Sequence, residues 1–187
     1  MKIRFWISVL SVLLTPEITC IAAADADSSA ADVEAPVKRF LDFYFHEYRR
    51  GLPGESQLPD LASFVTPEFL NLFVTAMAGE DCYAKKNNYE GPPAIEGDLF
   101  SSLFEGGTSA TYKLVDQKAD KAIVEIEWTH DDKNIAPEPF VWKDRVFLAR
   151  TEKGWLISDF AHLGTWDFMK KGNVSQGLRE VASECSD

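Results

Sequence analysis

The spacing of apolar side chains changes once along the chain, from a helical period to strict alternation. In the first half, one helical stripe follows the i, i+3, i+4, i+7, i+11 spacing: Val37, Phe40, Leu41, Tyr44 and Tyr48. Pro36 suits the first turn of a helix, where its missing N–H costs nothing, so the pattern predicts a helix that begins there. Gly51 and Pro53 predict its end. The small, acidic residues 27–35 predict a flexible leader in front of it.

A second helix is predicted to begin at Thr66-Pro67-Glu68, which combines a hydroxyl cap, a proline in the first turn and an acid near the positive end of the helix dipole. Its buried stripe is Phe69, Phe73, Ala76 and Met77. Residues 175–184 predict a short last helix.

Alternating apolar and polar positions predict four strands, at residues 108–115, 122–130, 140–150 and 155–161. Helices followed by consecutive strands indicate an α+β fold, with the N-terminal helices packed on one face of a curved antiparallel sheet. Residues 95–112 connect the two parts. We expect this segment to turn Phe100 and Phe104 inward.

The N-terminus has the pattern of a signal peptide over residues 1–26. Lys2 and Arg4 precede an apolar run, Phe5 to Leu14, and A-x-A cleavage patterns lie at 22–24 and 24–26. Ten apolar-rich residues are too few to span a bilayer, which takes about 20. The sequence therefore predicts a periplasmic or secreted protein that leaves the membrane after cleavage. Cys20 raises the alternative of a lipid anchor, although Glu17 and Thr19 do not fit that motif.

Three cysteines are present, and cleavage would remove Cys20. The remaining pair, Cys82 and Cys185, permits one disulfide in an exported protein. Such a bond closes a loop of about a hundred residues, for which the chain-entropy model gives about 4–5 kcal/mol. The alternative is two unpaired, buried thiols.

Composition narrows the possible functions. About 160 mature residues suffice for one domain, residues 36–187. The 12% aromatic content supports a packed core, and the net charge of −11 argues against nucleic acid and anionic membranes. Gly106-Gly107 lacks the pattern of a phosphate loop. No metal motif is visible and no cofactor is expected, since His46, His130 and His162 are scattered.

One pair of carboxylates is a candidate for acid–base chemistry. Counting outward from the turn at Thr151 to Gly154 places Asp144 and Asp159 on the same covered face, as diagonal neighbours about 7–8 Å apart. The alternative is that both are charges at the rim of the sheet. A slip of one residue would move one of them to the other face. The candidate binding residues are the core or pocket aromatics Trp128, Trp142, Trp155 and Tyr112.

Two motifs carry a family resemblance. The closing strand has Gly154, Trp155, Ile157 and Asp159, in the form G-W-x-I-x-D. Before the first strand stand Pro93, Gly97-Asp98, Phe100 and Ser101-Ser102. With the order of elements, these resemble the nuclear transport factor 2-like superfamily, in particular a branch of small exported bacterial proteins of unknown function. The resemblance covers residues 36–184 and implies a cone-shaped fold with a conical pocket, but no chemistry, because that fold serves isomerases, dehydratases, binders and toxin-neutralising proteins.

These observations predict an exported soluble binding protein. It would hold a small apolar ligand in the cone pocket or a protein partner on the sheet, and toxin neutralisation is one version of the second case. A homodimer is also possible. The alternative is an isomerase or hydrolyase that uses Asp144 and Asp159. A pocket filled by aromatic side chains would favour the protein partner.

Overall fold

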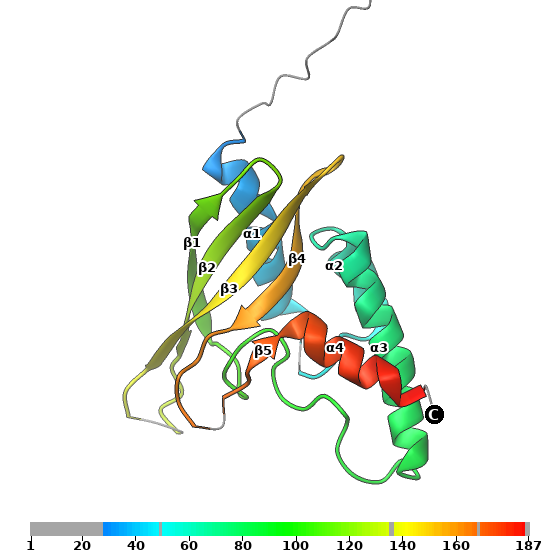
Figure 1. Cartoon of the computed structure of the whole chain (residues 1–187). Coiled ribbons are helices and arrows are strands. Elements are labelled where there is room, and N and C mark those ends of the chain that lie inside the picture. The colour runs from blue at the N-terminus through cyan, green and yellow to red at the C-terminus, as the bar shows by residue number, and fades with distance from the viewer. Residues whose placement is uncertain (1–27, 49, 135–136, 168, 186–187) are drawn as a thin grey trace, which may run out of the picture.

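The computed structural model describes residues 28–48, 50–134, 137–167 and 169–185. The predicted signal peptide and Cys20 lie outside the described residues. Within the described part of the chain, no helix has the length and apolar character needed to cross a membrane. The helices and one curved antiparallel sheet form an α+β structure, as expected (Figure 1).

The sheet is a meander in which each strand pairs with the next in sequence. Its strands are β1 (Ser109–Gln117), β2 (Lys121–His130), β3 (Phe140–Thr151), β4 (Gly154–His162) and the two-residue β5 (Gly172–Asn173). The four long strands confirm the alternating pattern to within two residues at each end. The sequence did not predict β5, which is too short to show a period.

Helix α1 (Ala30–His46) begins six residues before the predicted start. The Ser29 side chain accepts a hydrogen bond from the Asp32 backbone N–H, and the Asp32 carboxylate accepts one from the Ser29 backbone N–H. This capping box satisfies the first N–H groups of the helix. Val33 is fully buried and extends the apolar stripe back by one turn from Val37. The prediction of a flexible leader through residue 35 is therefore wrong for Ala30 to Ala35.

The other helices follow the expected order. The 3₁₀ turn η1 (Glu55–Gln57) and α2 (Leu58–Ala62) lead to α3 (Pro67–Lys86), which Thr66 caps by accepting a 3.2 Å hydrogen bond from the Phe69 N–H. The chain ends with α4 (Val174–Ala182) and the 3₁₀ turn η2 (Ser183–Cys185), and both lie beside α3.

The α3–α4 pair is close and covalently linked. A Cβ atom at Gly79 would lie 2.0 Å from the backbone oxygen of Val181, so the two helices touch through their backbones and only glycine fits at position 79. The predicted disulfide joins Cys82 to Cys185, whose Cα atoms are 5.4 Å apart. It fixes the last helix to the second long one.

The space between the sheet and the helices is filled by aromatic rings. Phe40 on α1 contacts Phe100 and Phe160 at ring-centroid distances of 5.1 and 4.7 Å, and Tyr44 contacts Trp128 at 4.8 Å. Within this layer the largest fully buried aromatic side chains are Trp128, Phe40, Phe64, Phe69, Phe73, Phe100 and Phe160. Aromatic packing thus occupies the concave side of the sheet, where the family resemblance implies a pocket.

Candidate functional site

The two candidate catalytic carboxylates lie on opposite faces of the sheet. Leu148 pairs with Ile157 as expected, but Phe147 pairs with Asp159, which leaves Ser158 as an extra residue in β4. This bulge shifts the register by one and turns Asp159 to the convex face, while Asp144 faces the helices. The prediction that they share a face is wrong, and the hypothesis of a catalytic pair loses its geometry.

Asp144 is an anchor for the segment that enters the sheet. Its buried carboxylate accepts hydrogen bonds from the Ser102 N–H (2.9 Å), the Trp142 indole (3.1 Å), the Leu163 N–H (2.8 Å) and the Ser102 hydroxyl. A carboxylate offers about four lone-pair positions, and all four are used here. Asp144 therefore ties residues 101–103 and the end of β4 to the sheet.

Asp98 is a second buried carboxylate in the same segment. It accepts hydrogen bonds from the Tyr44 hydroxyl (2.5 Å) and from the N–H groups of Phe100 and Ser101 (2.8 Å each). Burial raises the pKa of Asp98 to about 6, although these hydrogen bonds and the Lys170 ammonium act in the other direction. Asp98 holds the turn that carries Phe100 into the core.

The turn that begins at Asp98 shows that one of the two phenylalanines expected to point inward does not. Phe100 is fully buried, as expected, but Phe104 is 44% exposed. The Asp98 N–H donates to the Phe104 carbonyl (2.8 Å), and the Phe104 ring lies against Gly97 outside the core. A Cβ at Gly97 would meet that ring at 2.5 Å, so the ring needs a glycine beneath it.

Asp159 caps the N-terminus of α4, and its carboxylate accepts four hydrogen bonds. It accepts hydrogen bonds from the Ser175 N–H (3.0 Å) and hydroxyl (2.7 Å), the Asn173 side chain (2.8 Å) and the Phe160 N–H (2.8 Å). A carboxylate at a helix N-terminus satisfies unpaired N–H groups and favours the helix dipole. Its role is to join β4 to α4.

The predicted binding aromatics do not surround one cavity. Trp128, Trp142 and Trp155 are 0%, 6% and 6% exposed and belong to the core. Tyr112 is half-buried and lines a shallow depression of about 190 Å³ on the sheet, together with Glu125 and Lys143. Of the two readings, core or pocket lining, the burial of the three tryptophans agrees with the core.

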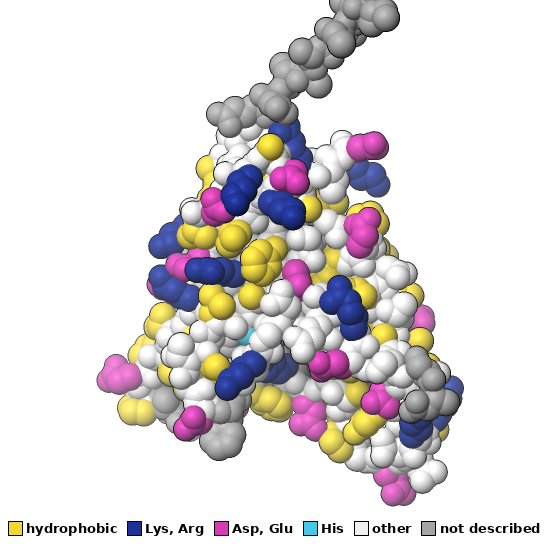
Figure 2. Space-filling view, viewed as in Figure 1, with side chains coloured by type: hydrophobic (Ala, Val, Ile, Leu, Met, Phe, Trp, Pro, Cys, Tyr) yellow, Lys and Arg dark blue, Asp and Glu magenta, His cyan; other side chains and the backbone are white. Residues whose placement is uncertain are grey.

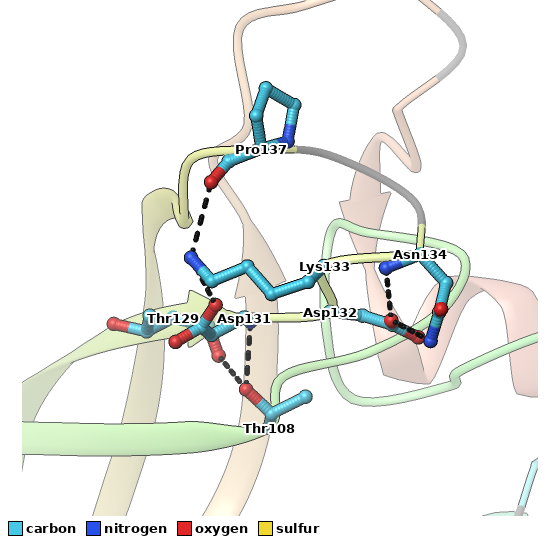
Figure 3. Close-up of polar contacts among 7 residues, drawn as sticks. All are labelled: Thr108, Thr129, Asp131, Asp132, Lys133, Asn134 and Pro137. Carbon is cyan, nitrogen blue, oxygen red and sulfur yellow. Dashed lines mark hydrogen bonds and ion pairs between the residues drawn. The ribbon is translucent and has the colours of Figure 1, made fainter.

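The loop between β2 and β3 contains several acidic residues, and some of its polar groups pair with one another. Asp132 accepts hydrogen bonds from the backbone and side chain of Asn134 (2.8 and 2.9 Å), and Lys133 pairs with Asp131 at 3.1 Å (Figure 3). The Asp131 N–H donates to the Thr108 hydroxyl at 2.9 Å. These contacts shape the described part of the loop. Within the described ranges, no group of three His, Cys, Asp or Glu is placed to hold a metal ion.

The convex face of the sheet carries an open groove of about 530 Å³. Ile123 on β2 pairs with Phe147 on β3, and Ala149 follows on the same face; all three are half-buried. Figure 2 shows hydrophobic side chains gathered on this face, with both basic and acidic side chains around them. The groove lining is Asp116, Lys118, Lys121, Ala122, Ile123, Phe147, Leu148, Ala149, Ser158, Asp159 and Asn173.

The sequence contains a pattern that indicates this groove, but a search for alternating apolar and polar residues does not detect it. Residues 146–149 of β3 are an unbroken apolar run, Val-Phe-Leu-Ala, as are residues 122–124 of β2, Ala-Ile-Val. A strand that is solvated on one face alternates apolar and polar residues. An unbroken run in an antiparallel meander therefore indicates apolar groups on both faces.

A charged ladder continues the same face beyond the groove. Glu125 on β2 lies 2.8 Å from the Lys143 ammonium and 3.5 Å from that of Lys113, and Lys143 also reaches Glu127 at 3.6 Å. The convex face thus has an apolar zone at one end of the strands and paired charges at the other. Comparisons of the chain with protein-family models, curated proteins and solved structures find no match.

Proposed function

We propose that the protein is an exported binding protein that recognises a protein partner on the convex face of its sheet, with Phe147 at the centre of the contact. The observation that carries the proposal is an apolar groove on a sheet face that no helix of the described residues covers, opposite a concave side already filled by aromatic rings. Pockets for small molecules are concave and enclose most of the ligand, whereas protein interfaces combine an apolar centre with a polar rim. The convex face has the second arrangement.

The proposal includes the family and the compartment. The resemblance to the nuclear transport factor 2-like superfamily is supported by the α+β order of helices followed by a curved antiparallel meander. Export through the N-terminal segment is supported by the disulfide between Cys82 and Cys185, because such bonds persist outside reducing compartments. The proposed location is the periplasm or the extracellular space.

Site-specific photocrosslinking in secreting cells tests the proposed function. A photoreactive amino acid at position 147 should give a discrete product with a second protein. Position 74 provides the control, because Val74 is 46% exposed on α3, away from the sheet. Equal products from both positions, or none from position 147, would contradict the proposal.

A further inference from the structure

We infer that the open edge of β1 pairs with the β1 strand of a second copy of this chain, in an antiparallel register centred on Thr111. The pairing joins the sheets of the two copies into one. This inference concerns the edge of the sheet rather than its convex face, so it goes beyond the proposed function and does not depend on it.

The two edges of the sheet differ in how the chain covers them. At the β4 edge, the Thr66 N–H donates to the Ile157 carbonyl and the Ile157 N–H donates to the Phe64 carbonyl, both at 2.8 Å. The short strand β5 pairs with the end of β4 beyond them. The β1 edge, at the outer side of the sheet in Figure 1, receives hydrogen bonds from α1 and its cap at one end, where Glu34 accepts from the Leu114 N–H at 2.8 Å.

The uncovered part of the β1 edge exposes backbone donors and acceptors. Residues of an antiparallel strand alternate between facing their partner strand and facing away from it. The Leu114 N–H faces away from β2, since it donates to Glu34, and the register is unbroken from Ser109 to Leu114. The N–H and C=O groups of Ala110 and Tyr112 therefore point outward as well, and no described residue is hydrogen-bonded to them.

The devices that protect a sheet edge are confined to the other half of β1. A bulge interrupts the register between Leu114 and Asp116, and Glu34 occupies the outward N–H of Leu114. Bulges and covering segments are common ways to prevent one edge from pairing with another. Because residues 109–112 have neither, this stretch remains a template for an added strand.

A second copy matches this template in one register. With a two-fold axis at Thr111, the Ala110 N–H of each copy donates to the Tyr112 carbonyl of the other, and the Tyr112 N–H donates to the Ala110 carbonyl. This register uses the open groups and does not need the Leu114 N–H. A two-fold axis at Tyr112 would place that occupied N–H opposite Ala110 of the second copy.

The side chains around the axis are compatible with the same register. On the convex side, Thr111 lies opposite Thr111 of the second copy, and Lys113 lies opposite Ser109, so no like charges face each other. On the concave side, Ala110 pairs with Trp128, whose ring contacts the 38% exposed Phe45 at 6.3 Å. The open backbone groups thus have an apolar border, which the pairing brings against the same border of the second copy.

Disulfide trapping of the purified, oxidised protein provides the test. In the inferred register Thr111 is a non-hydrogen-bonded pair across the axis, with Cα atoms about 4.5 Å apart, which is within the range for a disulfide. Thr111→Cys should therefore form a covalent dimer roughly tenfold faster than Val115→Cys. Val115 is the matched control, because it is 44% exposed in the same strand but far from the axis.

A double variant tests the register itself. Ser109→Cys with Lys113→Cys should form the covalent dimer, because each new cysteine lies opposite the other one in the second copy. Either change alone should not, since equivalent positions are then about 13 Å apart along the strands. Equal dimer formation at Thr111→Cys and Val115→Cys, or equal formation by the double and single variants, would overturn the inference.

The backbone contribution is tested at Ala110. Ala110→Pro removes an N–H that points away from β2, and proline is tolerated on edge strands where its position faces solvent. In the Thr111→Cys background it should slow dimer formation roughly tenfold, because the N–H it removes donates across the axis. Thermal unfolding checks that the variant folds, and an unchanged rate in the folded variant would contradict the inference.

Amide hydrogen exchange of the unmodified protein gives a test that needs no variant. The amides of Ala110 and Tyr112 should exchange more slowly as the protein concentration is raised, whereas that of the exposed Gly91 should not change. Exchange that is independent of concentration would overturn the inference. A Thr111→Cys variant that crosslinks in secreting cells to a different protein, and not to itself, would assign the edge to another chain and overturn it too. The groove at Phe147 is unaffected by any of these results.

Discussion

The two faces of β2 and β3 are both apolar but differ in what covers them. On the concave face, even-numbered residues of β2 and β3 such as Trp128, Val146 and Leu148 are at most 1% exposed and pack on aromatic rings. On the convex face, Ile123 and Phe147 are also apolar, but they form the floor of an open groove. The concave side therefore contributes most of the packing, and the binding that we propose would use the convex side. Neighbouring residues in one strand can be used to separate the two roles.

The largest effect is expected for Phe100→Ala in the concave core. Phe100 is fully buried and contacts the rings of Phe40 and Tyr48. Truncating a buried phenylalanine costs about 3–5 kcal/mol of unfolding free energy. Phe104→Ala, in the same segment but 44% exposed, should cost about 1 kcal/mol. Urea unfolding of both variants measures the difference, and equal losses would show that the two side chains are equally buried.

A second comparison uses adjacent residues of β3. Leu148→Ala should lower the unfolding free energy by about 2–5 kcal/mol, because Leu148 is 1% exposed in the core. Phe147→Ala should lower it by about 1 kcal/mol, because the ring is already in contact with solvent. Binding of a partner identified by the crosslinking experiment should show the reverse order. A register different from the one described would exchange the two results.

The third comparison concerns pH and Asp98. Burial raises its folded-state pKa to about 6, whereas an unfolded aspartate titrates near 3.9. The folded state therefore holds this proton more tightly than the unfolded state. The stabilising contribution is fully present below about pH 4 and is lost as the pH rises through about 6, a change of about 2–3 kcal/mol.

Asp98→Asn isolates this contribution. The unfolding free energy of the wild type minus that of the variant should fall between pH 4.5 and 7.5. Subtracting the variant removes the effect of the other acids, including Glu125, whose pKa is lowered by its hydrogen bond to Lys143. A difference that stays constant with pH would show that folding does not raise the pKa of Asp98.

The sequence predicted the elements better than it predicted the positions of individual side chains. Alternation and helical spacing located the four long strands and the two main helices, and the two cysteines located the disulfide. The register of β4 failed at Ser158, because a single extra residue leaves the apolar pattern on both sides of it intact. Asp159 consequently moved to the other face.

The other errors have similar local causes. The start of α1 was missed because Pro36 was taken as the first turn of the helix. The capping box of Ser29 and Asp32 starts the helix earlier and leaves Pro36 inside it. The position of Phe104 depends on a turn closed by its own carbonyl and the Asp98 N–H, which no periodicity reports. The groove was missed because the strands were predicted from alternating apolar and polar residues. The groove depends on residues 146–149, which are all apolar and do not alternate.

The disulfide also determines how the molecule responds to cleavage of its backbone. The bond between Cys82 and Cys185 spans 103 positions and encloses all five strands in one covalent ring. A protease cut between residues 83 and 184 leaves the two pieces joined under non-reducing conditions. A cut between Gly51 and Gly54 leaves α1 attached only through noncovalent contacts. Denaturing electrophoresis without reductant would therefore release residues before Gly51 as a separate fragment, while every cut inside the ring would stay hidden until the bond is reduced.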